Sequence, residues 1–166
     1  TGDVIERVET PIGEDETAEA LFDRLSKIGA DTLISTLSLI ESGRAQRTRQ
    51  DEKYATYAHI LSREDGAINW NVPARAVRNR IRGCYSWPIA TTMSGETRIK
   101  VYTAAVGEKT DAVPGTVISI DARGMQVACG DGESVFITVL QFPNAKRMTP
   151  AEYFRGHPSI LGTVLE

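Results

Sequence analysis

Residues 114–140 read PGTVISIDARGMQVACGDGESVFITVL, and this stretch decides the fold of the second half of the chain. Three short apolar runs are separated by two turn signals, Ala122-Arg123-Gly124 and Gly130-Asp131-Gly132. Short runs between glycine-containing turns are typical of antiparallel strands joined by hairpins. The stretch therefore predicts three strands: from Pro114-Gly115 to Ile120, from Met125 to Cys129, and from Ser134 to Leu140.

The same pattern continues on both sides of this stretch. Residues 89–93 and 98–106 flank the turn Ser94-Gly95-Glu96, and residues 149–155 predict a short closing helix with Thr149 as its cap. The glycines at 130–132 could also belong to a phosphate-binding loop, but no helix start follows them, which favours a hairpin. Five or six short antiparallel strands suit a small, partly open β-barrel of the OB type.

The first 43 residues follow different patterns. Residues 3–12 alternate apolar and charged side chains, which predicts one strand. Two runs with helical spacing follow, and Gly29 between them predicts a break between two short helices. One strand and two amphipathic helices cannot bury their own apolar faces, so we expect residues 1–43 to be the tail of a larger α/β domain that begins before Thr1. Residues 44–56 lack apolar periodicity and predict a linker, which leaves residues 57–166 as a separate domain in an α+β chain.

Charge is distributed unevenly along the 166 residues. The net charge is −3 overall, but it is −6 over residues 1–52, +5 over residues 53–106 and −2 over residues 107–166. A change of sign on this scale predicts an anionic partner that faces the middle of the chain. No apolar stretch is long enough for a membrane helix, and no signal peptide is visible. Cys84 and Cys129 lack CxxC spacing and predict buried thiols in a reducing compartment, and the two histidines lack the spacing of a metal site.

The most informative charges lie on a helix predicted from Ala74 to Gly83. At helical spacing, Arg75, Arg78 and Arg82 form a stripe beside an apolar stripe that would dock the helix. The arginine stripe could be a solvated face, but it has no glutamate to pair with, and arginine grips phosphate well. On the strand that follows, Arg98 and Lys100 face the same side. Together these residues predict an RNA-binding surface, with Trp70 and Trp87 expected to pack rather than to stack on bases.

Catalytic signatures are absent, because the sequence contains no GxSxG, Walker-type or HExxH motif. Several segments instead resemble, in order and spacing, the junction and C-terminal domain of the methionyl-tRNA formyltransferase family. The opening TGDVI and the segment ETAEALFDRLSKIGADTLISTL (16–37) resemble the end of the N-terminal domain of that family. The segments that match the junction and the C-terminal domain are TYAHILSREDGAINW (56–70), IRGCYSWP (81–88), RIKVYTA (98–104), PGTVIS (114–119) and MQVACGDG (125–132).

The resemblance implies transfer of a formyl group from 10-formyltetrahydrofolate to the amino group of initiator methionyl-tRNA in the cytoplasm. The family's catalytic Asn, His and Asp lie on a Rossmann-like sheet before the Thr-Gly that matches Thr1-Gly2, so this chain is expected to hold no catalytic residue and to be inactive alone. The resemblance implies that the barrel domain holds the tRNA. It also implies an enzyme that is a monomer and uses no metal. Ile60 stands where relatives often have lysine, and Arg63 would partly replace that charge. The residues expected to contact tRNA are Arg63, Arg75, Arg78, Arg82, Arg98 and Lys100.

Two alternatives stay open at this point. The sugar-nucleotide formyltransferases share the implied architecture, although the junction segments TYA and INW favour the tRNA enzyme. The chain could also be a stand-alone RNA-binding module with an OB-like barrel. The unburied apolar faces expected in residues 1–43 argue against this second alternative.

Overall fold

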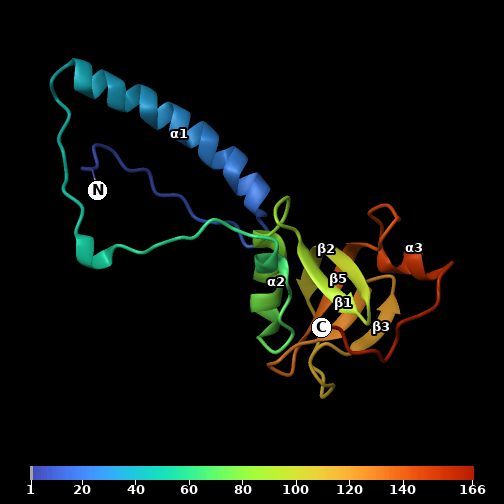
Figure 1. The fold of residues 1–166 in the computed structure, drawn as a ribbon. Coiled ribbons are helices and arrows are strands. Elements are labelled where there is room, and N and C mark those ends of the chain that lie inside the picture. Colours follow the sequence, from blue (N-terminus) through green and yellow to red (C-terminus); the bar gives the residue numbers. More distant parts are fainter. Residues whose placement is uncertain (1) are drawn as a thin grey trace. The chain divides into compact units, whose positions relative to one another are not determined.

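The computed structural model describes residues 2–166, and it divides the chain into two compact units, Thr1–Ile60 and Leu61–Glu166. Figure 1 labels the helices and strands of both units. No helix in the described part of the chain combines the length and the apolarity needed to cross a bilayer.

The N-terminal unit is built around one long helix, α1 (Ala18–Glu41), whose start is capped by the Thr17 hydroxyl. The prediction of two helices is wrong: Gly29 lies inside α1, where glycine costs only about 1 kcal/mol relative to alanine. The strand predicted over residues 3–12 is also wrong. Only Val4 pairs there, with Thr48, through two backbone hydrogen bonds of 2.9 and 2.8 Å.

Polar contacts hold the first residues of the chain along α1. Arg24 donates to both carboxylate oxygens of Glu16 at 2.8 Å and to the Pro11 carbonyl. Glu6 accepts hydrogen bonds from the hydroxyls of Ser35 and Thr36. A short 3₁₀ helix, η1 (Glu52–Tyr54), follows later in this unit. α1 buries none of its residues, and its exposed large apolar side chains are Phe22, Leu25, Leu33, Ile34, Leu37 and Ile40.

The C-terminal unit contains a five-stranded antiparallel sheet in the order β1-β2-β5-β4-β3. The hairpins predicted from the turn signals are confirmed, and so is the α+β class. β1 and β3 are the edges of this open sheet, and Figure 1 shows α2 at one side of it and α3 at the other. The strands are β1 (Ala90–Ser94), β2 (Thr97–Val106), β3 (Val117–Asp121), β4 (Gly124–Ala128) and β5 (Ser134–Gln141).

Residues 162–166 connect the two edges of the sheet. Beside β3, the Val117 amide donates to the Thr163 carbonyl and the Leu165 amide donates to the Gly115 carbonyl, both at 2.9 Å. Beside β1, Met93 and Glu166 exchange two backbone hydrogen bonds of 2.6 and 3.0 Å. The same five residues therefore satisfy backbone groups at both edge strands, which would otherwise be open for pairing.

Helix α2 (Ala74–Gly83) packs on β2 and β5. The predicted docking stripe is confirmed, because Ala74, Val77 and Ile81 are all buried. Pro73 holds the cap position without a side-chain bond, and the Asp131 carboxylate accepts from the Ala74 amide at 3.1 and 3.2 Å. A carboxylate from the β4–β5 turn thus satisfies the helix N-terminus.

The glycine before Asp131 fits tightly against the segment that leads into α2. The Gly130 amide donates to the Val72 carbonyl at 3.0 Å, and a Cβ at position 130 would lie 2.2 Å from the Asn71 carbonyl oxygen. Only glycine allows this approach. The turn at 130–132 is therefore a structural hairpin that anchors α2, as the sequence favoured.

The predicted closing helix is confirmed as α3 (Pro150–Phe154), with a capping box between Thr149 and Glu152. The remaining short element is a 3₁₀ turn, η2 (Glu64–Gly66). Within it, the Asp65 carboxylate accepts hydrogen bonds from the amide and the hydroxyl of Ser62.

Both cysteines are buried, as predicted. Burial raises the pKa of the Cys84 thiol, and it raises the pKa of Cys129 from its ordinary value near 9 to about 12, with the nearby charges of Asp131 and Glu133 adding to the effect. The folded protein therefore holds both as neutral thiols near neutral pH, and thiolates are the reactive form.

We expect the raised pKa of Cys129 to lower stability at high pH. The unfolded thiol ionises first, so the free energy of unfolding falls as pH rises from about 9 to about 12. Urea unfolding at pH 8 and pH 10.5 measures this fall. Cys129→Ala is the control: its loss of stability over the same interval should be smaller, and an equal loss would contradict the prediction.

Candidate nucleic-acid interface

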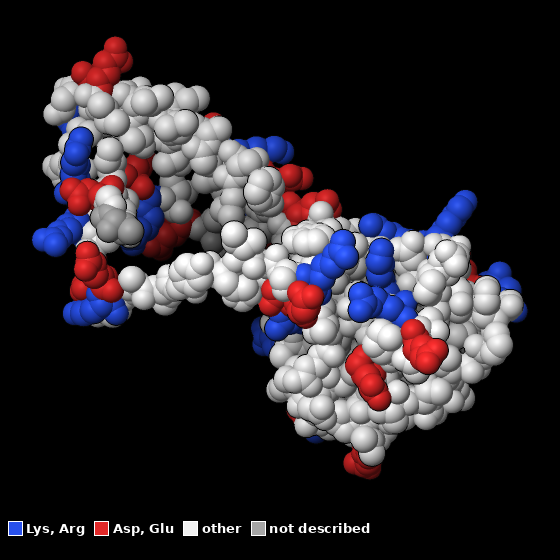
Figure 2. Space-filling view, in the orientation of Figure 1, with Lys and Arg blue, Asp and Glu red and all other residues white. Residues whose placement is uncertain are grey.

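A cleft of about 300 Å³ in the C-terminal unit brings three of the predicted binding residues together. Figure 2 shows lysine and arginine side chains gathered on this face of the unit, over the β1–β2 hairpin. The lining residues come from the segment before η2, the loop after α2, and strands β1 and β2: Arg63, Trp87, Pro88, Ile89, Thr91, Arg98 and Lys100.

Strand alternation places two of these cations. On β2, Ile99 and Val101 are buried in the core, so Arg98 and Lys100 point to the opposite side, where both are exposed. Neither side chain forms an ion pair with any residue between 2 and 166. Both positive charges are therefore available to an external anion.

A close backbone contact brings Arg63 to the same cleft. A Cβ at Gly66 would lie 2.3 Å from the Ile89 carbonyl oxygen, so glycine alone lets η2 approach the loop after α2. The Ile68 amide donates to the Thr91 carbonyl at 2.9 Å, which ties the same segment to β1. Arg63, just before η2, is held beside the hairpin that carries the other two cations.

The two tryptophans differ in their surroundings. Trp70 is 3% exposed and its indole N–H donates to the Thr92 hydroxyl at 2.9 Å, which confirms that it packs in the core. Trp87 is 54% exposed and lines the cleft, so it does not pack in the core of this unit. The sequence suggested burial because Trp87 precedes proline, but the loop after α2 turns this side chain outward.

A second hollow, of about 250 Å³, lies on the other side of the same cations. It shares Arg98 and Lys100 and is otherwise lined by Gln141, Phe142, Pro143 and Asn144. Next to it, Gln141 accepts a hydrogen bond of 2.7 Å from the Tyr102 hydroxyl, and the Arg147 guanidinium lies 3.8 Å from the centre of the Tyr102 ring. Arg147 is a fourth cation on this surface. Sequence reasoning missed it, because no periodicity links it to β2.

The arginines of α2 occupy a different place, and none of them lines either hollow. Arg75 is exposed, whereas Arg78 is only 8% exposed. Arg82 is half-buried and donates to the Asn79 side chain at 2.8 Å. Arg80, off the stripe, donates to the Asp65 carbonyl at 3.0 Å. The structure thus separates the six predicted residues into three in the cleft and three on α2.

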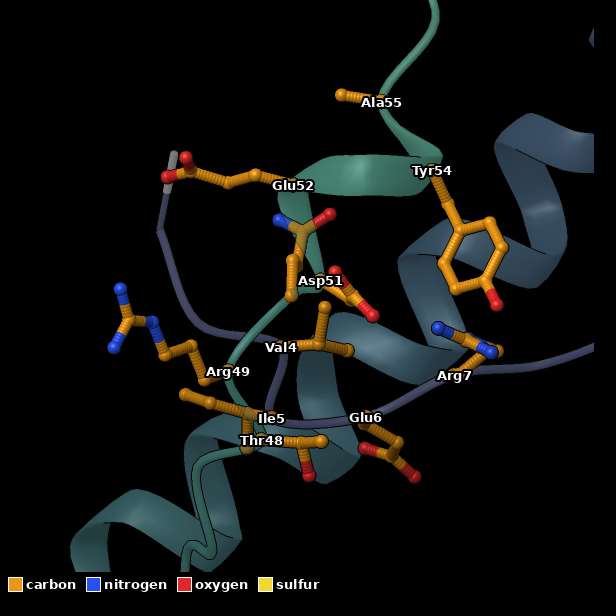
Figure 3. Close-up of a pocket in the computed structure, with 11 residues that line it drawn as sticks. Val4, Ile5, Glu6, Arg7, Thr48, Arg49, Asp51, Glu52, Tyr54 and Ala55 are labelled. Atoms are coloured by element: carbon orange, nitrogen blue, oxygen red, sulfur yellow. The ribbon is translucent and has the colours of Figure 1, made fainter.

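The N-terminal unit has a larger hollow, of about 590 Å³, between residues 4–7 and 48–55. Figure 3 shows Arg49 and Glu52 extended away from its centre, and the lining charges are of both signs. No histidine, cysteine or serine lines it. Among residues 2–166, no group of three His, Cys, Asp or Glu side chains is placed to hold a metal ion. Size alone does not make this hollow a site, and the basic cleft is the stronger candidate.

Residues 60–158 match the formyl transferase C-terminal domain, and the chain belongs to this family. It is 39% identical to the methionyl-tRNA formyltransferase of Trichlorobacter lovleyi over 165 residues. This alignment covers 99% of this chain and 52% of that protein. The chain spans about half the length of the curated relatives it matches and corresponds to their C-terminal part. The resemblance noted in the sequence is confirmed.

Solved structures share the fold at lower identity. A variant of HypX from Aquifex aeolicus matches with a TM-score of 0.68 at 18% identity, over 93% of this chain and 28% of that one. An N-formyltransferase from Helicobacter canadensis, in complex with folinic acid and dTDP-3-aminofucose, matches with a TM-score of 0.64 at 15% identity, over 82% and 50% of the two chains. At these identities the matches establish the fold alone.

Proposed function

We propose that this chain is the C-terminal portion of a methionyl-tRNA formyltransferase and that its basic cleft holds the tRNA. The complete enzyme would move a formyl group from 10-formyltetrahydrofolate to the amino group of initiator methionyl-tRNA. One observation carries the role of this part: Arg63, Arg98 and Lys100 converge on one cleft beside an exposed tryptophan.

Electrostatics supports a polyanionic ligand at this place. The chain is acidic overall, yet the cleft presents three cations, and neither of the two on β2 pairs with a carboxylate among residues 2–166. Arg98 and Lys100 are two positions apart on one strand face, a separation of about 7 Å, so they can contact different phosphates. Arginine can also bind a phosphate through two hydrogen bonds. Arg75, Arg78 and Arg82 remain proposed contacts of lower weight, because α2 places them outside the cleft.

The N-terminal unit fits the tail of a larger catalytic domain. Six large apolar side chains of α1 are 44–74% exposed, an apolar face that a stable domain would cover. We propose residues 1–43 as the end of a Rossmann-like α/β domain, 44–56 as a linker and 57–166 as an OB-like tRNA-binding domain. The catalytic Asn, His and Asp and the folate site would belong to the part of the enzyme outside this chain. The complete enzyme would act as a monomer in the cytoplasm and would need no metal.

A sugar-nucleotide formyltransferase is the second candidate, because the Helicobacter protein in complex with dTDP-3-aminofucose has the same fold. The 39% identity across 99% of this chain favours the tRNA enzyme over a neighbour that is 15% identical. A stand-alone RNA-binding module is disfavoured by the uncovered apolar face of α1. Binding of initiator tRNA against binding of a dTDP-sugar separates these candidates.

The direct test removes the two cations of β2. We expect Arg98→Ala combined with Lys100→Ala to weaken tRNA binding roughly tenfold at low salt and to reduce the slope of log K against log [salt] by about 2, because two phosphate contacts are lost. Fluorescence anisotropy with labelled initiator tRNA, at several salt concentrations, measures both quantities.

A matched control carries the same change of charge elsewhere in the unit. Lys109→Ala with Arg155→Ala also removes one lysine and one arginine, both exposed and outside the cleft. This variant should retain nearly the full slope. Equal slopes for the two double variants would show that binding follows net charge rather than the cleft, and the proposed function of this part would fail.

A further inference from the structure

Resting on the proposed function, we propose that the cleft takes an unpaired stretch of RNA, with one base stacked on the indole of Trp87. The flanking phosphates would be held by Arg98 and Lys100 on one side and Arg63 on the other. The cleft would thus select a single-stranded or looped segment over a regular helical stem.

The surroundings of Trp87 carry this inference. More than half of its surface is exposed, and no hydrogen bond or ring contact engages the indole within residues 2–166. Leaving a large apolar ring in water is unfavourable, and here the ring stands among three cations. An exposed aromatic ring within a positively charged groove is the combination that binds single-stranded nucleic acid, because every base has a face that can stack and the backbone is anionic.

The backbone around Trp87 is held in an unusual conformation. Ser86 and Ile89 have positive φ angles of 77° and 72°, and the left-handed region is costly for a β-branched residue such as isoleucine. The Ile89 amide donates to the Cys84 carbonyl at 2.9 Å, and its carbonyl faces Gly66 at close range. Such strain persists only where surrounding contacts impose it, and it is concentrated at functional sites. The backbone on both sides of Trp87 is therefore held in place before any ligand arrives, which reduces the entropy lost on binding.

The second hollow extends the proposed binding surface for single-stranded RNA beyond the cleft. Arg98 and Lys100 separate the two hollows, and beyond them Arg147 lies on the Tyr102 ring. An RNA segment that extends from Trp87 across β2 would therefore meet a further cation, Arg147. In a duplex, base faces are already stacked on their neighbours, so a stem could use its phosphates along this surface but not the indole.

The experiment compares a single-stranded uridine octamer with an RNA duplex of eight base pairs. We expect Trp87→Ala to weaken binding of the octamer roughly 5- to 100-fold and Trp87→Phe to retain most of the affinity, because stacking needs an aromatic face. Binding of the duplex should change less than twofold in either variant. The control is Tyr57→Ala, which removes another exposed aromatic ring outside the cleft and should leave octamer binding unchanged.

Fluorescence provides a second readout that does not depend on the alanine variant. The chain has two tryptophans, and Trp70 is buried, so stacking should quench the emission of Trp87 as the octamer binds. Trp87→Phe should abolish this quenching while the octamer still binds.

The outcomes separate this proposal from the proposed function. If Trp87→Ala leaves octamer binding intact while the double variant at Arg98 and Lys100 weakens it, the stacking proposal is overturned and the cleft still binds RNA. Equal weakening of octamer and duplex binding by Trp87→Ala also overturns it. If neither variant affects binding of tRNA or octamer, the proposed function of the cleft fails as well.

Discussion

Replacing Gly130 by alanine is expected to lower the free energy of unfolding of the C-terminal unit by about 3 kcal/mol. The new Cβ would lie 2.2 Å from the Asn71 carbonyl oxygen and 2.4 Å from its carbonyl carbon, both rigid backbone atoms. Relief would require the β4–β5 turn to withdraw from the start of α2. The same movement would break the bond from Gly130 to Val72 and remove the Asp131 carboxylate from the Ala74 amide.

Gly83→Ala is the matched control for this substitution. Gly83 is the last residue of α2, and a Cβ there would meet nothing within 4 Å. Alanine in that helix position should leave stability unchanged or raise it by up to about 1 kcal/mol. Urea unfolding followed by tryptophan emission, in which buried Trp70 becomes exposed to water, measures both variants. A loss of less than about 1 kcal/mol for Gly130→Ala would mean that the turn does not fix α2.

Reversing both charges on β2 is expected to have the largest effect on RNA binding. Arg98→Glu with Lys100→Glu should weaken tRNA binding by roughly 100-fold or more at low salt, because two attractive contacts become two repulsive ones. The fold should survive, since both side chains are exposed and point away from the core. Anisotropy titrations with initiator tRNA measure the loss, and added salt should reduce the difference from the unmodified chain.

Two comparison variants identify where the tRNA lies. Lys109→Glu with Arg155→Glu makes the same change in net charge outside the cleft and should cost far less affinity. Arg75→Glu with Arg82→Glu places the reversal on α2. If the α2 variant lost more affinity than the β2 variant, the binding surface would be centred on the helix, as the sequence alone had suggested.

Local patterns predicted the sheet well. The strands between residues 114 and 140 followed from turn residues that act on their immediate neighbours, so no distant contact was needed to place them. α1 was missed for a related reason. A glycine both ends helices and is tolerated inside them, and the choice at Gly29 depends on a cost of about 1 kcal/mol that the surrounding helix-forming residues outweigh.

The candidate site was predictable only where it lies on a single element. The shared face of Arg98 and Lys100 followed from strand alternation. The position of Arg63 beside the cleft depends instead on the close contact between Gly66 and Ile89. The exposure of Trp87 depends on a loop whose backbone angles cannot be read from its sequence. The burial of Arg78 was missed because a helical wheel gives the direction of a side chain but not the depth to which the helix docks.

The pairing of residues 162–166 with both edge strands has a consequence for synthesis of the protein. Glu166, which exchanges hydrogen bonds with Met93, is translated about seventy positions after it. Backbone groups of β1 and β3 therefore stay unsatisfied until residues 162–166 have left the ribosome. Until then, the nascent sheet can pair with the wrong partner, including a neighbouring nascent chain on the same polysome. This unit should therefore complete its sheet only after residues 162–166 are free to pair, and the interval before that is when it is vulnerable.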